Sequence, residues 1–135
     1  MENLTTYHDE DEKDSVYIYL GGYHNKSKQV ILKKIYGENE HCEYMHEGDI
    51  DVYGFLILEN LREKTEIPFR PLNMGVDTVK RFFDAKIYKE LTTSDINMIE
   101  KKKDKLGEYR QALEFMLLHN CKVEQESIRA VEILN

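Results

Sequence analysis

The sequence predicts an α+β domain, with an N-terminal antiparallel β-hairpin or small sheet packed against two to three C-terminal helices, one of them long. Residues 15–20 alternate in the way a strand does, the second half carries apolar residues at helical spacing, and residues 92–95 are typical of a helix start. With 135 residues, 41% hydrophobic and 33% charged, the chain has the composition of one globular domain.

The N-terminal half is expected to begin with a flexible acidic tail over residues 1–14, which leaves residues 15–135 as a single domain. Residues 15–20 are rich in β-branched and aromatic side chains, which favour a strand. The glycine-rich turn at residues 21–26 connects it to a second strand over residues 30–36, which completes an antiparallel hairpin.

Residues 50–61 fit two structures. Ile50, Val52 and Leu56 alternate as in a strand, whereas Tyr53, Ile57 and Leu61 follow a helical spacing. Asp49 could cap a helix, but Gly54 lowers helix propensity, so we favour a strand that enters a short turn.

The C-terminal half is predicted to be helical. Pro68 and Pro71 mark a loop, and an amphipathic helix follows over residues 76–91. A long helix is expected from about Asp95 to His119. Residues 121–135 predict a short final helix, with a strand as the alternative.

Charge is distributed unevenly along the chain. Residues 1–61 carry 13 acidic residues and 5 lysines, a net charge of −8, whereas residues 62–135 carry 13 acidic and 14 basic residues, a net charge of +1. The negative charge is concentrated in two runs, residues 9–14 and residues 38–51. Such a pattern informs the choice of partner rather than the fold, and it disfavours nucleic acid and anionic membranes.

The acidic run at residues 38–51 is the best candidate for a recognition surface, because it lies between predicted ordered elements. We expect a small acidic, non-catalytic interaction protein that occupies a basic surface of a partner, in its strongest form a phage-type inhibitor that mimics DNA. The competing interpretation is that the charge only aids solubility. The predicted partner-binding residues are Glu38, Glu40, Glu43, Glu47, Asp49 and Asp51.

The expected partner is a basic protein, such as a nucleic-acid-binding protein, and no direct contact with nucleic acid or membrane is expected. The chain shows no secretory signal and no apolar run of membrane-spanning length, and its two cysteines match no disulfide framework. We therefore expect a cytoplasmic protein without a cofactor. The basic run at residues 101–105 is interpreted as a solvated helix face.

The apolar stripe of the predicted long helix offers an alternative function as an oligomeric regulator. Packing within the domain is the main interpretation of this stripe, and homodimerisation along it is the alternative. The predicted dimer face consists of Ile99, Leu106, Tyr109, Leu113 and Leu117.

A small metal-binding enzyme is the weaker alternative. Asp49, Asp51 and Gly54 resemble the start of an EF-hand calcium loop, but Tyr53 and Asn60 occupy positions where the loop needs oxygen ligands. A second group lacks the spacing of known zinc motifs, since its two histidines are five residues apart; it comprises His41, Cys42, Glu43, His46 and Glu47. Neither pattern predicts a metal site, and no catalytic residue is assigned.

Overall fold

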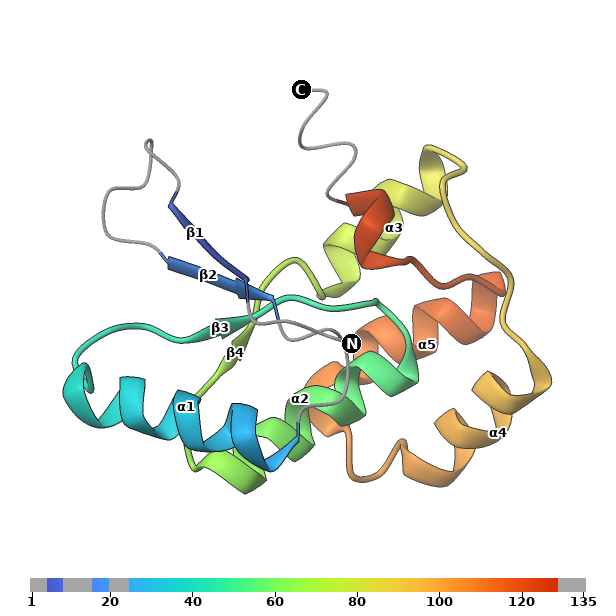
Figure 1. Ribbon diagram of the computed structural model, residues 1–135. Coiled ribbons are helices and arrows are strands. Elements are labelled where there is room, and N and C mark those ends of the chain that lie inside the picture. The colour runs from blue at the N-terminus through green and yellow to red at the C-terminus, as the bar shows by residue number, and fades with distance from the viewer. Residues whose placement is uncertain (1–4, 9–15, 20–24, 129–135) are drawn as a thin grey trace.

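The computed structural model describes residues 5–8, 16–19 and 25–128, and it confirms the α+β class in its coarse form (Figure 1). The helices are α1 (Lys26–Glu38), α2 (Val52–Thr65), α3 (Val76–Asp84), α4 (Thr93–Lys102), the 3₁₀ turn η1 (Gly107–Tyr109) and α5 (Arg110–His119). The strands are β1 (Thr5–His8), β2 (Val16–Tyr19), β3 (Met45–His46) and β4 (Arg70–Pro71).

The strands differ from the predicted hairpin. β2 falls where a strand is predicted, but it pairs antiparallel with β1, which precedes it inside the predicted tail. The predicted second strand at residues 30–36 is wrong, because this segment belongs to α1. β3 and β4 form a separate parallel pair, with Met45 opposite Arg70. The acidic run 9–14 and most of the predicted turn, residues 21–24, lie outside the described residues.

α1 begins where the sequence provides a cap. The side chain of Asn25 accepts a hydrogen bond of 2.9 Å from the backbone N–H of Lys28, which satisfies one of the free amides at the helix start. Lys28 and Leu32, four residues apart, are the buried side chains of this helix. A helical face therefore overrides the β propensity of the Val30 to Tyr36 stretch.

α2 replaces the strand predicted at residues 50–61, and this prediction is wrong. Asp51 caps the helix by accepting a 2.7 Å hydrogen bond from the N–H of Gly54. Gly54 is required there because a Cβ atom would lie 2.0 Å from the carbonyl oxygen of Asp49. Only Ile50 keeps β character, in an isolated antiparallel bridge to Val123.

The predicted long helix at residues 95–119 is also wrong, because the chain turns between α4 and η1. Thr92 and Asp95 form the predicted helix start as a reciprocal capping box. The break follows Lys102, and α5 then runs to His119. α3 is shorter than predicted, ending at Asp84, and residues 125–128 are helical at the start of the predicted final helix. Residues 129–135 lie outside the described residues.

The core consists of buried side chains from α2, α3, α4 and α5. α1 and α4 both pack against α2, which lies in the middle of the molecule, and α3 packs against α5 (Figure 1). Phe55 and Leu58 of α2 are completely buried, and the ring of Phe55 stacks on that of Tyr109 with centroids 4.4 Å apart. α2 is therefore the element from which the polar sites described below project.

Candidate functional site

Arg62 organises a polar cluster on the exposed side of α2. Its Nη1 donates to the carboxylates of Glu59 at 2.8 Å and Glu108 at 2.7 Å, and its Nε donates to the carbonyl of Phe69 at 2.6 Å. The Tyr109 hydroxyl donates to Glu59 at 3.0 Å. Hydrogen bonding to Arg62 lowers the pKa of Glu108, so this ion pair persists at neutral pH.

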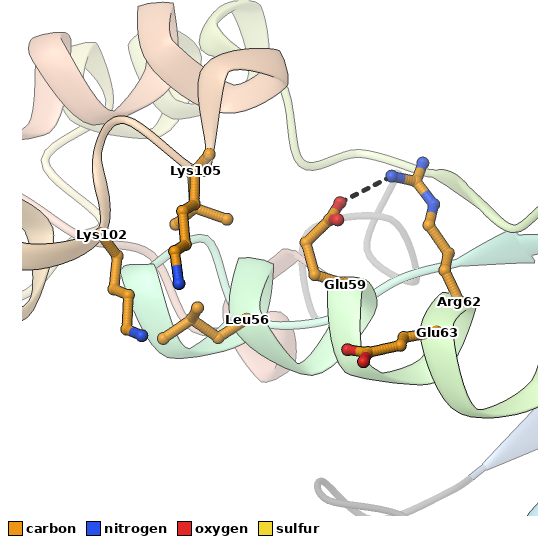
Figure 2. Close-up of a pocket in the computed structure, with 7 residues that line it drawn as sticks. Leu56, Glu59, Arg62, Glu63, Lys102 and Lys105 are labelled. Carbon is orange, nitrogen blue, oxygen red and sulfur yellow. Dashed lines mark hydrogen bonds and ion pairs between the residues drawn. The ribbon is translucent and has the colours of Figure 1, made fainter.

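A pocket of about 500 Å³ lies beside this cluster, between α2 and the turn that follows α4 (Figure 2). Leu56 and Leu106 supply its apolar surface. Lys102 and Lys105 project into it from the side of the turn. The complete lining is Leu56, Glu59, Arg62, Glu63, Lys102, Lys105 and Leu106. Both lysines belong to the basic run at residues 101–105, for which the sequence predicts a solvated helix face.

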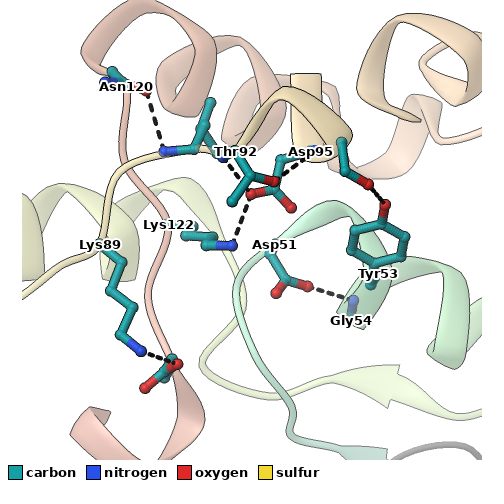
Figure 3. A network of polar contacts seen from close by, with 11 residues as sticks. Asp51, Tyr53, Gly54, Lys89, Thr92, Asp95, Asn120 and Lys122 are labelled. Carbon is teal, nitrogen blue, oxygen red and sulfur yellow. Dashed lines mark hydrogen bonds and ion pairs between the residues drawn. The ribbon is translucent and has the colours of Figure 1, made fainter. Parts of the chain in front are cut away.

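A second polar site, here called the polar corner, lies at the start of α2 and consists of Asp49, Asp51, Asp95 and Lys122. Figure 3 shows the last three of these residues. It joins three parts of the chain: the segment that enters α2, the first turn of α4, and the segment after α5. The structure thereby brings residues together that are 27 and 76 positions apart in sequence.

Asp51 is held in a low-polarity setting at this corner. Burial is the main cause that raises its pKa from 3.8 to about 6. The hydrogen bond from Gly54 opposes this shift, while the nearby carboxylates of Asp49 and Asp95 add to it and Lys122 again opposes it. Asp51 therefore carries a proton in part at mildly acidic pH.

Asp95 and Lys122 form the buried ion pair of the corner. The Lys122 Nζ donates to Asp95 Oδ2 at 2.7 Å, and the two side chains are 19% and 2% exposed. Burial alone would raise the pKa of Asp95, but the hydrogen bonds from Lys122 and Thr92 outweigh it and lower the pKa. Asp95 thus remains ionised and neutralises the ammonium of Lys122.

Backbone pairing fixes the position of Lys122. The main chains of Lys89 and Lys122 exchange two hydrogen bonds of 2.9 and 2.8 Å, and Val123 pairs in the same way with Ile50. The N–H of Gln125 donates to Asp49 Oδ1 at 2.7 Å. The Ile50–Val123 and Asp49–Gln125 contacts together form a clasp between the entry to α2 and the segment after α5.

The six predicted partner-binding residues separate into two groups. Glu38, Glu40 and Glu43 are exposed at the end of α1 and in the loop after it. The others are half-buried and accept hydrogen bonds from within the domain: Glu47 from Asn73 and Gln125, Asp49 from Gln125, and Asp51 from Gly54. The structure therefore does not present them as one surface of free carboxylates.

The predicted dimer face lies mostly in the core. Four of its five residues, Ile99, Leu106, Tyr109 and Leu113, are at most 5% exposed, and Leu117 is half-buried against the same core. The stripe is thus covered by this chain's own helices, as its main interpretation requires. Homodimerisation along it stays an untested prediction.

Among the described residues, no group of three or more His, Cys, Asp or Glu side chains is placed to hold a metal ion. Tyr53 lies in the first turn of α2, with its hydroxyl hydrogen-bonded to the Ser94 hydroxyl, so residues 49–60 do not form a calcium loop. Asp49 and Asp51 are the residues of the polar corner that could hold a cation. Mg²⁺ commonly uses one or two protein carboxylates and takes its other ligands from water and phosphate.

No helix among the described residues is long and apolar enough to cross a membrane.

Of the polar corner, sequence patterns single out Asp49 and Asp51, and Asp95 appears only as a helix cap. Nothing in the sequence points to Lys122, because its role arises from the pairing of its backbone with Lys89.

Comparison with known proteins gives two matches. The family described as "Wadjet protein JetD, C-terminal" matches residues 1–134. The Wadjet protein JetD of Bacillus cereus (strain Q1) is 31% identical to this chain over 134 residues. That alignment covers 95% of this chain and 32% of the Bacillus protein, so the chain spans about one third of the length of the curated relative.

These matches overturn the functional hypothesis drawn from charge. They extend over almost the whole chain and lead to a Wadjet protein, so the interpretation as a phage-type inhibitor that mimics DNA is wrong. The acidic composition misled because net charge constrains which partners are attracted or repelled and carries no information about family.

Proposed function

The chain belongs to the Wadjet JetD C-terminal family, and from this membership we propose that it acts as a JetD-type domain within a multi-subunit, anti-plasmid DNA-processing complex. The observation that carries the proposal is the family match over residues 1–134. Protein partners follow from this role, since a domain of a multi-subunit complex works in contact with other chains.

A domain exchange tests this role. The matching third of the Bacillus cereus JetD is replaced by this chain, and plasmid uptake is measured in cells that carry the remaining Wadjet genes. The exchanged protein is expected to restrict plasmids, whereas deletion of the same third abolishes restriction. A chimaera with Leu113→Asp, which places a carboxylate in the core, is the misfolded control. A chimaera that copurifies with its partners but leaves plasmid uptake at the deletion level contradicts the proposal.

A second candidate function concerns the polar corner, where Asp49 and Asp51 would hold a divalent cation against a DNA phosphate. Carboxylates repel phosphates, so an acidic corner in a DNA-processing domain can approach the DNA backbone through a cation. A bound cation would polarise the phosphate and activate a water molecule. The observation that favours this role is the placement of Asp49 and Asp95 near Asp51. Burial is the main cause of the raised pKa of Asp51, but both neighbouring carboxylates add to it, and a cation would relieve their repulsion.

The cation role predicts a specific effect of Asp51→Asn. Asparagine caps helices as well as aspartate does, so the variant keeps the hydrogen bond to Gly54 but loses the charge. We expect it to remain folded and to lose most of its affinity for Mg²⁺ or Mn²⁺ in calorimetric titrations with short duplex DNA present. Glu38→Gln, at the exposed end of α1, is the charge-matched control. Equal cation affinity of the two variants contradicts this role.

A further inference from the structure

The pocket between α2 and the turn after α4 contains two lysines whose charges converge. Figure 2 shows the side chains of Lys102 and Lys105 directed toward the same space above Leu56. Among the described residues, neither ammonium group forms an ion pair with a carboxylate. Lys103, between them in sequence, is paired with Glu100 at 2.9 Å. Two unpaired like charges that face one space repel each other, and an anion placed between them relieves that repulsion.

The remaining walls of the pocket compensate this positive charge only in part. Glu59 is the carboxylate nearest the centre of α2, and it is already engaged by Arg62 and Tyr109. Glu63 lies on the wall opposite the lysines in Figure 2. The lysine side of the pocket is therefore the part that suits an anionic group.

We infer that Lys102 and Lys105 bind a phosphate group of the DNA backbone in this pocket. The inference rests on the proposed DNA-processing function, which makes DNA the anion that this domain meets. Lysine suits phosphate because it acts as a mobile point charge with three donors. The negative net charge of the whole chain does not prevent such a contact, since residues 62–135 carry a net charge of +1 and include the pocket lysines.

The geometry of α2 separates the pocket from the polar corner. Leu56 follows Asp51 by five residues on the same helix, which corresponds to about 8 Å along the axis. Five residues also correspond to a rotation of about 140° around the helix, so the pocket and the polar corner lie on different faces of α2. The phosphate at the lysines is therefore a contact separate from the polar corner.

Salt-dependent DNA binding tests the inference. The affinity of the chain for a fluorescent 20-base-pair duplex is measured by anisotropy over a range of salt concentrations. The double variant Lys102→Gln/Lys105→Gln removes one phosphate contact, so it is expected to reduce the magnitude of the slope of log K against log salt by about 1 and to weaken binding about tenfold near 0.1 M salt. Lys33→Gln/Lys34→Gln removes the same charge from the exposed face of α1 and should leave the slope unchanged.

The outcomes separate this inference from the proposed function. Equal slopes for the two double variants overturn the inference, and so does a chain that binds no DNA at low salt. The inference is also overturned if inorganic phosphate shifts the NMR signals of the two lysines but DNA binding does not depend on these lysines. Plasmid restriction by the chimaera together with lysine-independent DNA binding refutes the inference alone. Lysine-dependent DNA binding by a chain whose chimaera fails to restrict plasmids refutes the proposed function alone.

Discussion

Asp51 is both a helix cap and a carboxylate under electrostatic strain. Its hydrogen bond to Gly54 favours the charged form, while burial and the neighbouring carboxylates favour the protonated form, and the balance lies with protonation. The same residue that starts α2 thus weakens the folded state when it is ionised. Residues with such opposed demands often occur at functional sites.

The raised pKa of Asp51 predicts a specific dependence of stability on pH. The folded state holds the proton of Asp51 more tightly than the unfolded state does. The contribution of Asp51 to the free energy of unfolding is therefore complete below about pH 4 and is lost as the pH rises through about 6. The free energy of unfolding of Asp51→Asn should equal that of the wild type at pH 4 and should exceed it at pH 7, by at most about 3 kcal/mol. Urea denaturation at pH 4, 5, 6 and 7 measures the difference. A difference that does not change with pH contradicts the assignment.

The Asp95–Lys122 pair should be costly to break from one side. Lys122→Met leaves Asp95 buried without its counter-ion, and the free energy of unfolding is expected to fall by about 3 kcal/mol. The double variant Asp95→Asn/Lys122→Met should recover much of this loss, because asparagine can keep the cap on Thr92. Lys89→Met, which breaks the exposed pair with Glu124, is the control and should change stability little. Chemical denaturation of all three variants decides the point.

At the scale of elements, α2 shows why a local pattern can be misread. Gly54 lowers helix propensity, and for this reason the sequence favours a strand at residues 50–61. The structure gives the glycine another purpose, since it lets the first turn of α2 lie against the carbonyl of Asp49. A steric requirement between neighbouring segments is invisible to propensity, which considers one residue at a time.

Two glycine substitutions should therefore have opposite effects. Gly54→Ala places its Cβ against the Asp49 carbonyl and is expected to destabilise the domain by about 2 kcal/mol, despite the better helix propensity of alanine. Gly37→Ala, in α1, meets no atom within 4 Å and should be neutral or stabilising by up to about 1 kcal/mol. Thermal unfolding of both variants provides the comparison. Similar melting temperatures for the two variants would refute the steric explanation.

The broken helix carries a related lesson. Ile99, Leu106 and Leu113 recur every seven residues and are all buried, as the apolar stripe predicts. The chain nevertheless turns between the first and second of them, before Gly107. Periodicity identifies which residues face the core, but it does not show that the backbone between them is continuous. The helix start at Thr92 is predicted correctly, because a helix cap depends on adjacent residues alone.

At the scale of the whole molecule, the fold class was predictable and the topology was not. Composition and apolar spacing depend on averages over many residues, so they support an α+β domain. The pairing of β1 with β2, and of Ile50 with Val123, depends on contacts between distant segments. The candidate site divides in the same way: Asp49 and Asp51 stand out in the sequence, whereas Lys122 joins them only through long-range pairing.

The clasp between Asp49 and Gln125 also has a consequence for how the chain folds during synthesis. Its two sides are 76 residues apart, so the entry to α2 cannot be secured until the segment after α5 has left the ribosome. Contacts of such long sequence separation are entropically costly to form and tend to slow folding. The apolar face of α2 therefore stays only partly covered until the chain has been synthesised as far as Gln125. In that interval a nascent chain would depend most on protection from aggregation.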